Sequence, residues 1–266
     1  MYKEFYGLKE NPFNVTSDPS FFFSSTYHAE AFSHLVYGIQ QRKGIILITG
    51  EIGTGKTTLC RALLNRLDQQ TRTAFILYPN FSEVQLLQMV IKDFGIQTSS
   101  SNKAAIINAL NEFLLGETNK GHNVVLIIDE AQNLKASQLE QIRLLSNLET
   151  EKEKLLQIIL VGQPELCEKL RLPSLRQLNQ RITIRNHIKP LEKKELKGYI
   201  QHRLHIAGAQ KDVLFTDEAL EEIFLCSMGT PRLINIICDR ALLAGFVAET
   251  WTIDYNIIKK CIEEIT

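Results

Sequence analysis

One eight-residue stretch constrains this chain more than any other, because it combines spaced glycines with a lysine and a threonine. It runs from Gly50 to Thr57 and fits the pattern G-x-x-x-x-G-K-[ST] at every fixed position. A β-branched run at 45–49 precedes it, and an apolar stripe at helical spacing follows it at 58–67. Backbone N–H groups and a helix N-terminus bind phosphate in this strand–loop–helix setting. The stretch therefore predicts a P-loop nucleotide site rather than a chance match.

The residues of this loop have separate predicted roles. Lys56 is expected to reach the β- and γ-phosphates of ATP, and Thr57 is expected to bind Mg²⁺. The glycines allow the backbone to wrap around the phosphates with several N–H groups pointing inward. The predicted nucleotide-binding residues are Gly50, Glu51, Ile52, Gly53, Thr54, Gly55, Lys56, Thr57 and Thr58.

Composition bounds the class of protein. The chain has 266 residues, of which 44% are hydrophobic and 23% charged, as in a globular protein of one large or two smaller domains. A formal net charge of zero gives no global attraction to nucleic acid or anionic membranes. No run of about 18 apolar residues is present. Five scattered cysteines without a C-x-x-C pair favour a reducing compartment, so a cytoplasmic chain is expected.

Strand and helix patterns alternate through most of the chain and then become helical. Expected strands cover 45–49, 73–78, 124–128, 155–161 and 182–188. Expected helices before and between them cover 28–41, 58–67, 82–94, 103–115, 135–148 and 174–180. Four further helices are expected at 191–207, 216–226, 231–247 and 253–265. The polar stretch at 98–102 is expected to be a surface loop. Alternation of this kind predicts an α/β fold with a parallel sheet.

Three regions are predicted from these patterns. Residues 1–40 form an aromatic-rich arm and a first helix that pack on the core, residues 41–189 form the P-loop core, and residues 190–266 form a small all-helical domain. The arm is expected to be extended and buried, because exposed aromatic rings favour aggregation. Two interpretations of the arm stay open. Its aromatic residues serve plain packing, or Pro12 and Phe13, with Tyr27 and His28, frame the adenine ring.

Two acidic residues end the most apolar strand. Asp129 and Glu130 follow the run Val124–Ile128, whose composition suits a central parallel strand buried on both faces. Ligands bind at the carboxyl ends of strands in open α/β sheets. Asp129 is therefore predicted to hold Mg²⁺, and Glu130 to orient and polarise the attacking water. The alternative for Asp129 is an acid that only caps the next turn, and the alternative for Glu130 is a structural acid.

Three further polar residues stand at positions that suit phosphate chemistry. Gln163 follows the fourth strand and is expected to hydrogen-bond the γ-phosphate or the water. Arg181 precedes the fifth strand and is the favoured arginine finger for a neighbouring subunit, with Arg176 as the other candidate. Arg232 begins a helix after Gly229-Thr230-Pro231 and is expected to meet the phosphates from the helical domain. Structural or solvated side chains are the alternative for each.

Several stretches together resemble a known family. They are Phe5–Leu8 with Asn11–Phe13, Thr49–Thr58, Ile128–Gln132, Leu144–Glu149, Val161–Leu166, Leu175–Ile182 and Gly229–Asn235. The chain resembles the AAA+ ATPases of the ExeA type, which include general secretion pathway protein A and the MSHA biogenesis protein MshM. Transposition ATPases of the TniB/TnsC kind and the ATPase of exosortase loci are also similar.

The resemblance implies both a fold and a setting. It implies an AAA+ core with a five-stranded parallel sheet of order 5-1-4-3-2 and a helical lid. Gln163 matches sensor 1 of the family, Arg181 the arginine finger and Arg232 sensor 2. Members act as ATP-dependent rings or other oligomers that support secretin or type IV pilus assembly at the inner membrane. Secretion protein A continues into a transmembrane helix and a peptidoglycan-binding region, so this chain is expected to be a short member or a cytoplasmic part.

Three functions are therefore compared. The first is a Mg²⁺-dependent ATPase that acts on a secretion or pilus assembly partner as a homo-oligomer. The second is an ATP-dependent DNA-binding regulator of transposition, which a net charge of zero does not favour. The third is a nucleotide-gated scaffold with negligible turnover, which a kinetic assay would separate from an ATPase.

Overall fold

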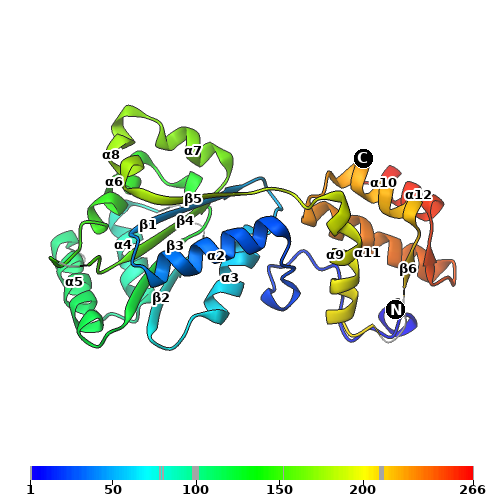
Figure 1. Cartoon of the computed structure of the whole chain (residues 1–266), viewed down its shortest axis with the longest axis horizontal. Coiled ribbons are helices and arrows are strands. Elements are labelled where there is room, and N and C mark those ends of the chain that lie inside the picture. Colours follow the sequence, from blue (N-terminus) through cyan, green and yellow to red (C-terminus); the bar gives the residue numbers. More distant parts are fainter. Residues whose placement is uncertain are drawn as a thin grey trace. The chain divides into compact units, whose positions relative to one another are not determined.

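The computed structural model describes residues 2–77, 79, 81–97, 102–151, 153–209 and 213–265. They form two compact units, drawn in Figure 1. One unit comprises Met1–His28, Gly53–Thr58 and Lys189–Thr266, and we call it the arm–helical unit. The other comprises Ala29–Ile52 and Leu59–Ile188, and we call it the sheet unit.

A parallel five-stranded sheet forms the centre of the sheet unit. Its order is β2-β3-β4-β1-β5, which is the expected order 5-1-4-3-2 counted from the other edge. All six residues of β1 are buried because β4 and β5 flank it and helices cover both faces. The strands are β1 (Ile45–Gly50), β2 (Thr71–Ile76), β3 (Asn123–Ile128), β4 (Gln157–Gly162) and β5 (Ile182–Ile188).

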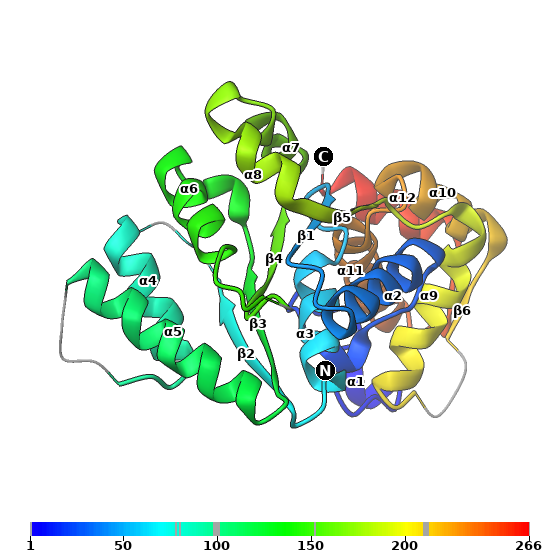
Figure 2. The same cartoon turned by 60° about the vertical axis from the view of Figure 1, so that its left-hand side comes forward.

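Helices cover both faces of this sheet. Ile45 and Leu47 of β1 belong to a buried cluster that also includes residues of the helices between positions 83 and 181. Ile46 points to the opposite face, where a Cβ atom on Gly38 of α2 would lie 2.4 Å from its Cδ1. Figure 2 shows α2 and α3 on one side of the sheet and α4 and α5 on the other. The first group is α2 (Thr26–Gln40) and α3 (Lys56–Arg66); the second is α4 (Glu83–Asp93), α5 (Lys103–Asn119), α6 (Ala136–Leu145), α7 (Pro164–Leu170) and α8 (Arg176–Arg181).

The arm–helical unit has one feature that the sequence patterns did not predict. Its carboxyl-terminal part is not wholly helical, because β6 and β7 form a small parallel pair. Each strand has two residues, which is too short for an alternating pattern to be visible in the sequence. The elements are α1 (Tyr2–Phe5), the 3-10 turn η1 (Pro19–Phe21), α9 (Lys193–Ile206), β6 (Leu214–Phe215), α10 (Asp217–Ser227), α11 (Pro231–Val247), β7 (Thr252–Ile253) and α12 (Tyr255–Glu263).

The amino-terminal arm packs on these carboxyl-terminal helices, so the prediction that residues 1–40 pack on the core is wrong for the arm. Tyr6, Phe13 and Phe21 are buried in one hydrophobic cluster with residues of α9, α10, α11 and α12. The Tyr6 ring lies edge-on to Trp251 at 5.2 Å, and its hydroxyl donates to the Thr250 carbonyl at 3.1 Å. The sequence shows that these rings must be buried, but it does not show against which apolar face.

Most helix and strand boundaries lie within about two residues of those predicted from the sequence. Ser82 caps α4 in a capping box with Gln85, and Thr216 caps α10, so both residues stand at the predicted starts of these helices. α5 continues four residues beyond its predicted end, to Asn119. Two predictions, the end of the second strand at Tyr78 and the loop at 98–101, lie outside the described residues. Across the described ranges, no helix is both long and apolar enough to cross a membrane.

A buried carboxylate ties the end of α5 to the sheet. Glu117 is 4% exposed, and its two oxygens accept hydrogen bonds from three side chains. The donors are His122 Nδ1 at 2.7 Å, Lys120 Nζ at 2.7 Å and Arg72 Nε at 2.9 Å. These bonds, first that from His122, lower the pKa of Glu117 from 4.5 to about 2.

We expect Glu117→Gln to lower the free energy of unfolding by about 1–3 kcal/mol at pH 7, because the buried side chain then no longer offers an ionised acceptor to its three donors. The pKa of Glu117 is lower in the folded protein, so its contribution is present above pH 4.5 and is lost as the pH falls toward about 2. Urea denaturation followed by circular dichroism at several pH values measures both effects. The matched control is Glu140→Gln, whose carboxylate is 43% exposed beside Arg143; a change of about 0.5 kcal/mol or less is expected there. Equal losses in the two variants would contradict the prediction.

Candidate nucleotide site

The glycine-rich loop leaves the carboxyl end of β1 and enters α3, which begins at Lys56. Gly53 has a φ of 80° and Gly55 a φ of 93°, in the left-handed region that favours glycine. Thr54 is fully buried and Lys56 is 6% exposed. The loop therefore favours glycine at position 55, which the pattern requires, and also at position 53, which the pattern leaves unspecified.

Two consecutive carbonyl oxygens of this loop have partners within the arm–helical unit. The Gly53 oxygen accepts from the Arg232 N–H at 3.2 Å. The Thr54 oxygen accepts from His28 Nε2 at 2.8 Å. A Cβ atom on Gly53 would lie only 2.7 Å from the Arg232 Cβ, so the first turn of α11 approaches the loop backbone closely. Arg232 thus contacts the loop through its backbone, while the residue as a whole is exposed.

His28 is held from both sides of its ring. A carbonyl oxygen only accepts, so Nε2 carries the hydrogen that the Thr54 oxygen receives. Nδ1 lies 2.6 Å from Ser25 Oγ and accepts from that hydroxyl. Burial lowers the pKa of His28, which is 3% exposed, so the neutral ring with hydrogen on Nε2 is favoured. The sequence suggested His28 for the adenine pocket, whereas its ring bonds to the loop.

The other predicted adenine residues lie in packed surroundings. Phe13 is 2% exposed and belongs to the hydrophobic cluster of the arm–helical unit. The Pro12 carbonyl accepts from Arg203 Nε at 2.5 Å. Plain packing accounts for both residues, and their contact with adenine stays a prediction.

The two predicted acids lie in the sheet unit, directly after β3. Asp129 is 1% exposed, and its backbone N–H donates to the Ile76 carbonyl at 2.9 Å. Its Oδ1 accepts from the Glu130 N–H at 2.9 Å. Glu130 has a φ of 52° and a ψ of 37°, which is a left-handed conformation for a residue with a side chain. Such backbone costs about 1–3 kcal/mol and is maintained by surrounding contacts.

Those contacts come from two glutamines, Gln132 in the turn after β3 and Gln163 directly after β4. Gln132 Nε2 donates to Glu130 Oε2 at 2.5 Å, and Gln163 Nε2 donates to the same oxygen at 3.3 Å. Gln132 Oε1 accepts from the Gln163 N–H at 3.1 Å, which closes the network. The structure thus brings predicted residues Glu130 and Gln163 together. Sequence reasoning assigned no role to Gln132; the one signal was its place in the motif Asp129–Gln132.

The two arginine-finger candidates differ in exposure. Arg181 ends α8, is half-buried, and lies with Nη1 3.5 Å from Ser146 Oγ of the same unit. Arg176 begins α8 and is exposed. An arginine finger must extend from the surface of its own subunit to reach a neighbouring one. Neither arginine is fully buried, so the choice between Arg176 and Arg181 stays open.

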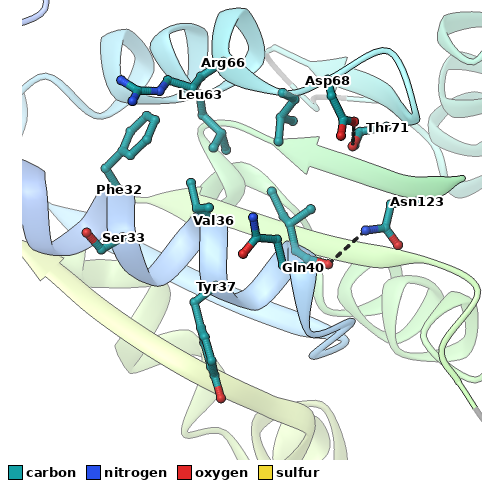
Figure 3. A pocket seen from close by; sticks show the side chains of 12 residues that line it. Phe32, Ser33, Val36, Tyr37, Gln40, Leu63, Arg66, Asp68, Thr71 and Asn123 are labelled. Carbon is teal, nitrogen blue, oxygen red and sulfur yellow. Dashed lines mark hydrogen bonds between the residues drawn. The ribbon is translucent and has the colours of Figure 1, made fainter.

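A separate groove lies near the amino-terminal ends of β2 and β3. It has a volume of about 590 Å³ and lies between α2 and α3, beside the first residues of β2 and β3 (Figure 3). The Asn123 side chain donates to the Ile39 carbonyl at 3.2 Å in its wall. No residue predicted for nucleotide chemistry lines this groove, whose lining is Phe32, Ser33, Val36, Tyr37, Ile39, Gln40, Leu63, Arg66, Leu67, Asp68, Thr71 and Asn123.

We expect Gly53→Ala to lower the midpoint of thermal unfolding and to weaken nucleotide binding, because its Cβ meets the Arg232 Cβ at 2.7 Å in addition to the strained φ. The matched control is Gly208→Ala in the same unit. Gly208 has a φ of 83°, and its added Cβ meets only the flexible side chain of Lys9. Gly208→Ala should cost about 1 kcal/mol through backbone strain and leave nucleotide binding unchanged. Identical behaviour of the two variants would show that the close approach at Gly53 has no effect.

Comparison with known proteins gives two matches in sequence. Residues 39–170 match a family model described as an AAA domain. Over its whole length the chain is 42% identical to general secretion pathway protein A of Aeromonas hydrophila, across 267 aligned residues. The chain spans about half of that relative, 49% of its length.

Solved structures share the fold at low sequence identity. The Cdc6p protein of Pyrobaculum aerophilum is 17% identical with a TM-score of 0.69, over 90% of this chain and 67% of that one. The ORC2 protein of Aeropyrum pernix is 17% identical with a TM-score of 0.63, over 89% and 66%. The RuvB branch migration motor of Thermotoga maritima is 21% identical with a TM-score of 0.59, over 89% and 68%.

The structural matches show the fold alone, and the sequence matches show the family. The expected sheet order and the expected resemblance are both confirmed. The chain belongs to the AAA-domain proteins related to general secretion pathway protein A.

Proposed function

We propose that this chain is a Mg²⁺-dependent ATPase whose hydrolysis cycle drives or gates the assembly of a secretion or type IV pilus system. Lys56 and the loop Gly50–Thr58 bind the triphosphate. Thr57 and Asp129 bind the metal, Glu130 activates water, and Gln163 and Arg232 respond to loss of the γ-phosphate. Arg181 completes the site of a neighbouring copy.

One observation carries the ATPase proposal. The loop backbone has left-handed glycines at positions 53 and 55, follows a strand buried on both faces, and leads into a helix whose first residue is Lys56. That geometry suits a triphosphate, because the N–H groups and the dipole of a helix N-terminus attract anionic oxygens. The Aeropyrum ORC2 structure with ADPNP and ADP supports an adenine nucleotide as the ligand.

The residues proposed for the metal have suitable chemistry. Mg²⁺ prefers hard oxygen donors and keeps several waters beside one or two carboxylates and substrate phosphates. Thr57 offers a hydroxyl and Asp129 a carboxylate that is 1% exposed at the end of β3. The metal would neutralise charge on the phosphates.

The relative supports the proposed setting. The matched half belongs to a protein named for the general secretion pathway. We therefore place the activity with an assembly protein at the cytoplasmic side of the inner membrane, in an ATP-dependent homo-oligomer. A DNA-binding role in transposition is less favoured, because the whole chain matches a secretion protein and its net charge is zero.

We expect Lys56→Ala to abolish ATP hydrolysis by removing the charge that holds the phosphates. Glu130→Gln should bind ATP with nearly normal affinity. Its turnover should fall by a factor of about 100 or more, because an amide cannot polarise water as a carboxylate does. Phosphate release and binding of labelled ATP measure the two properties. Glu165→Gln, which alters an exposed carboxylate in the first turn of α7, is the control and should retain wild-type turnover. Normal hydrolysis by Glu130→Gln would show that its assigned role is wrong.

Mixing two inactive variants tests whether Arg181 acts on a neighbour. Lys56→Ala has a defective loop and an intact arginine, whereas Arg181→Ala has the reverse. If the arginine acts between subunits, mixed oligomers contain some complete sites, and equimolar mixing should restore part of the ATPase activity.

Titrating one variant into the other at fixed total protein measures this restoration. Activity of Arg181→Ala alone would assign the finger elsewhere, and Arg176→Ala is the variant to compare. Two inactive variants that remain inactive when mixed would contradict a finger in trans.

A further inference from the structure

The sequence of the phosphate loop does not by itself fix the orientation of the peptide groups on either side of Thr54. Gly53 and Gly55 flank Thr54, and glycine gives little preference for one peptide orientation over another. In a planar trans peptide the C=O and N–H groups point in opposite directions. Whatever holds the Thr54 carbonyl therefore also fixes the direction of the Gly55 N–H, and the same holds for Gly53 and the Thr54 N–H.

His28 supplies the partner for the Thr54 carbonyl. Its Nε2 donates to that oxygen at 2.8 Å, and both residues are buried. A Cβ atom on Gly55 would lie 3.0 Å from the same Nε2, so the ring is seated against the loop at this peptide. The Phe22 ring lies edge-on to the His28 ring at 5.7 Å and limits its movement. Because a buried carbonyl without a partner is costly, His28 disfavours the flipped peptide.

The histidine is in turn anchored to α9. Ser25 Oγ lies 2.6 Å from His28 Nδ1, which fixes the hydrogen on Nε2. Thr26, the next residue after Ser25, donates its N–H at 2.8 Å and its hydroxyl at 2.9 Å to Glu195 Oε1. The other oxygen of Glu195 accepts from the Glu192 N–H at 2.9 Å and closes the capping box of α9. The segment Ser25–His28 thus connects the first turn of α9 to the loop through the hydrogen bonds of Thr26 and His28.

We propose that His28, anchored through Ser25 and Thr26 on Glu195, is a positioning residue that orients the Thr54–Gly55 peptide for nucleotide binding. The Gly55 N–H is the group that this orientation presents, and an anionic phosphate oxygen is the acceptor that it fits. The inference rests on the proposed nucleotide function, and it assigns to the arm a task other than packing.

The test measures equilibrium binding of fluorescently labelled ADP with Mg²⁺, together with the midpoint of thermal unfolding. His28→Ala should weaken ADP binding about tenfold or more, a factor that corresponds to about 1.4 kcal/mol. His28→Gln carries an amide N–H at a comparable reach and should restore affinity to within about threefold of wild type. His205→Ala, at an exposed histidine of α9, is the control and should bind as the wild type does.

The pattern of results separates a positioning role from a structural one. A lower unfolding midpoint in His28→Ala with unchanged ADP affinity would overturn the inference, as would failure of His28→Gln to restore binding. If the wild-type chain itself bound no ADP, the proposed function would fail instead. The two failures are therefore distinguishable.

The anchor on Glu195 is tested by a double-mutant cycle. Glu195→Ala removes the acceptor for both Thr26 bonds and should weaken ADP binding about threefold, through His28 alone. The double variant should then bind no more weakly than His28→Ala. If the fold loss of ADP affinity in the double variant equals the product of the two single losses, Glu195 does not act through His28. That result would overturn the proposed anchor.

Discussion

The phosphate loop depends on partners for two consecutive carbonyl oxygens, because its glycines leave the backbone free to rotate. Gly53 receives the Arg232 N–H and Thr54 receives the His28 ring. These partners lie about 200 positions apart in the sequence, because His28 ends the arm and Arg232 lies in the first turn of α11. Binding a polyanion needs N–H groups that are already oriented, since ordering them on binding would reduce affinity. The arm and the first turn of α11 therefore have a common physical task at the loop.

A second constraint holds at the acidic end of β3. Glu130 keeps a left-handed backbone that any residue with a side chain disfavours. Gln132 and Gln163 bond to its carboxylate, and Gln132 also holds the Gln163 backbone. The network orients this carboxylate through neutral amide donors, which suits the role in activating water that we propose for it. The turns that follow β3 and β4 are thus coupled through one side chain.

The sequence predicted the sheet from local patterns, because buried parallel strands give continuous apolar runs and glycine, proline and cap residues mark their ends. Ser82, Thr216 and Pro231 begin helices as predicted. The strand order came from the family resemblance, since a single sequence carries no pairing information. The features that the sequence did not predict depend on contacts between segments that are distant in the sequence. The arm's burial against α9–α12 and the bond from His28 to Thr54 depend on which surfaces meet, and no spacing of residues encodes that.

The two anchors of the loop share a support. Tyr199 of α9 donates its hydroxyl to Asn235 of α11 at 2.8 Å, and Arg203 donates to the Tyr199 hydroxyl at 3.1 Å. Arg203 also donates to arm carbonyls at Pro12 and Asn14. The arm, α9 and α11 are therefore one hydrogen-bonded layer, and a polar network that is fully satisfied resists independent movement of its members. If nucleotide binding turns one peptide of the loop, the strain passes to the partners of both carbonyls together. A layer joined in this way resists separate movement of the arm, α9 and α11, which suits it to couple the state of the nucleotide to a partner protein.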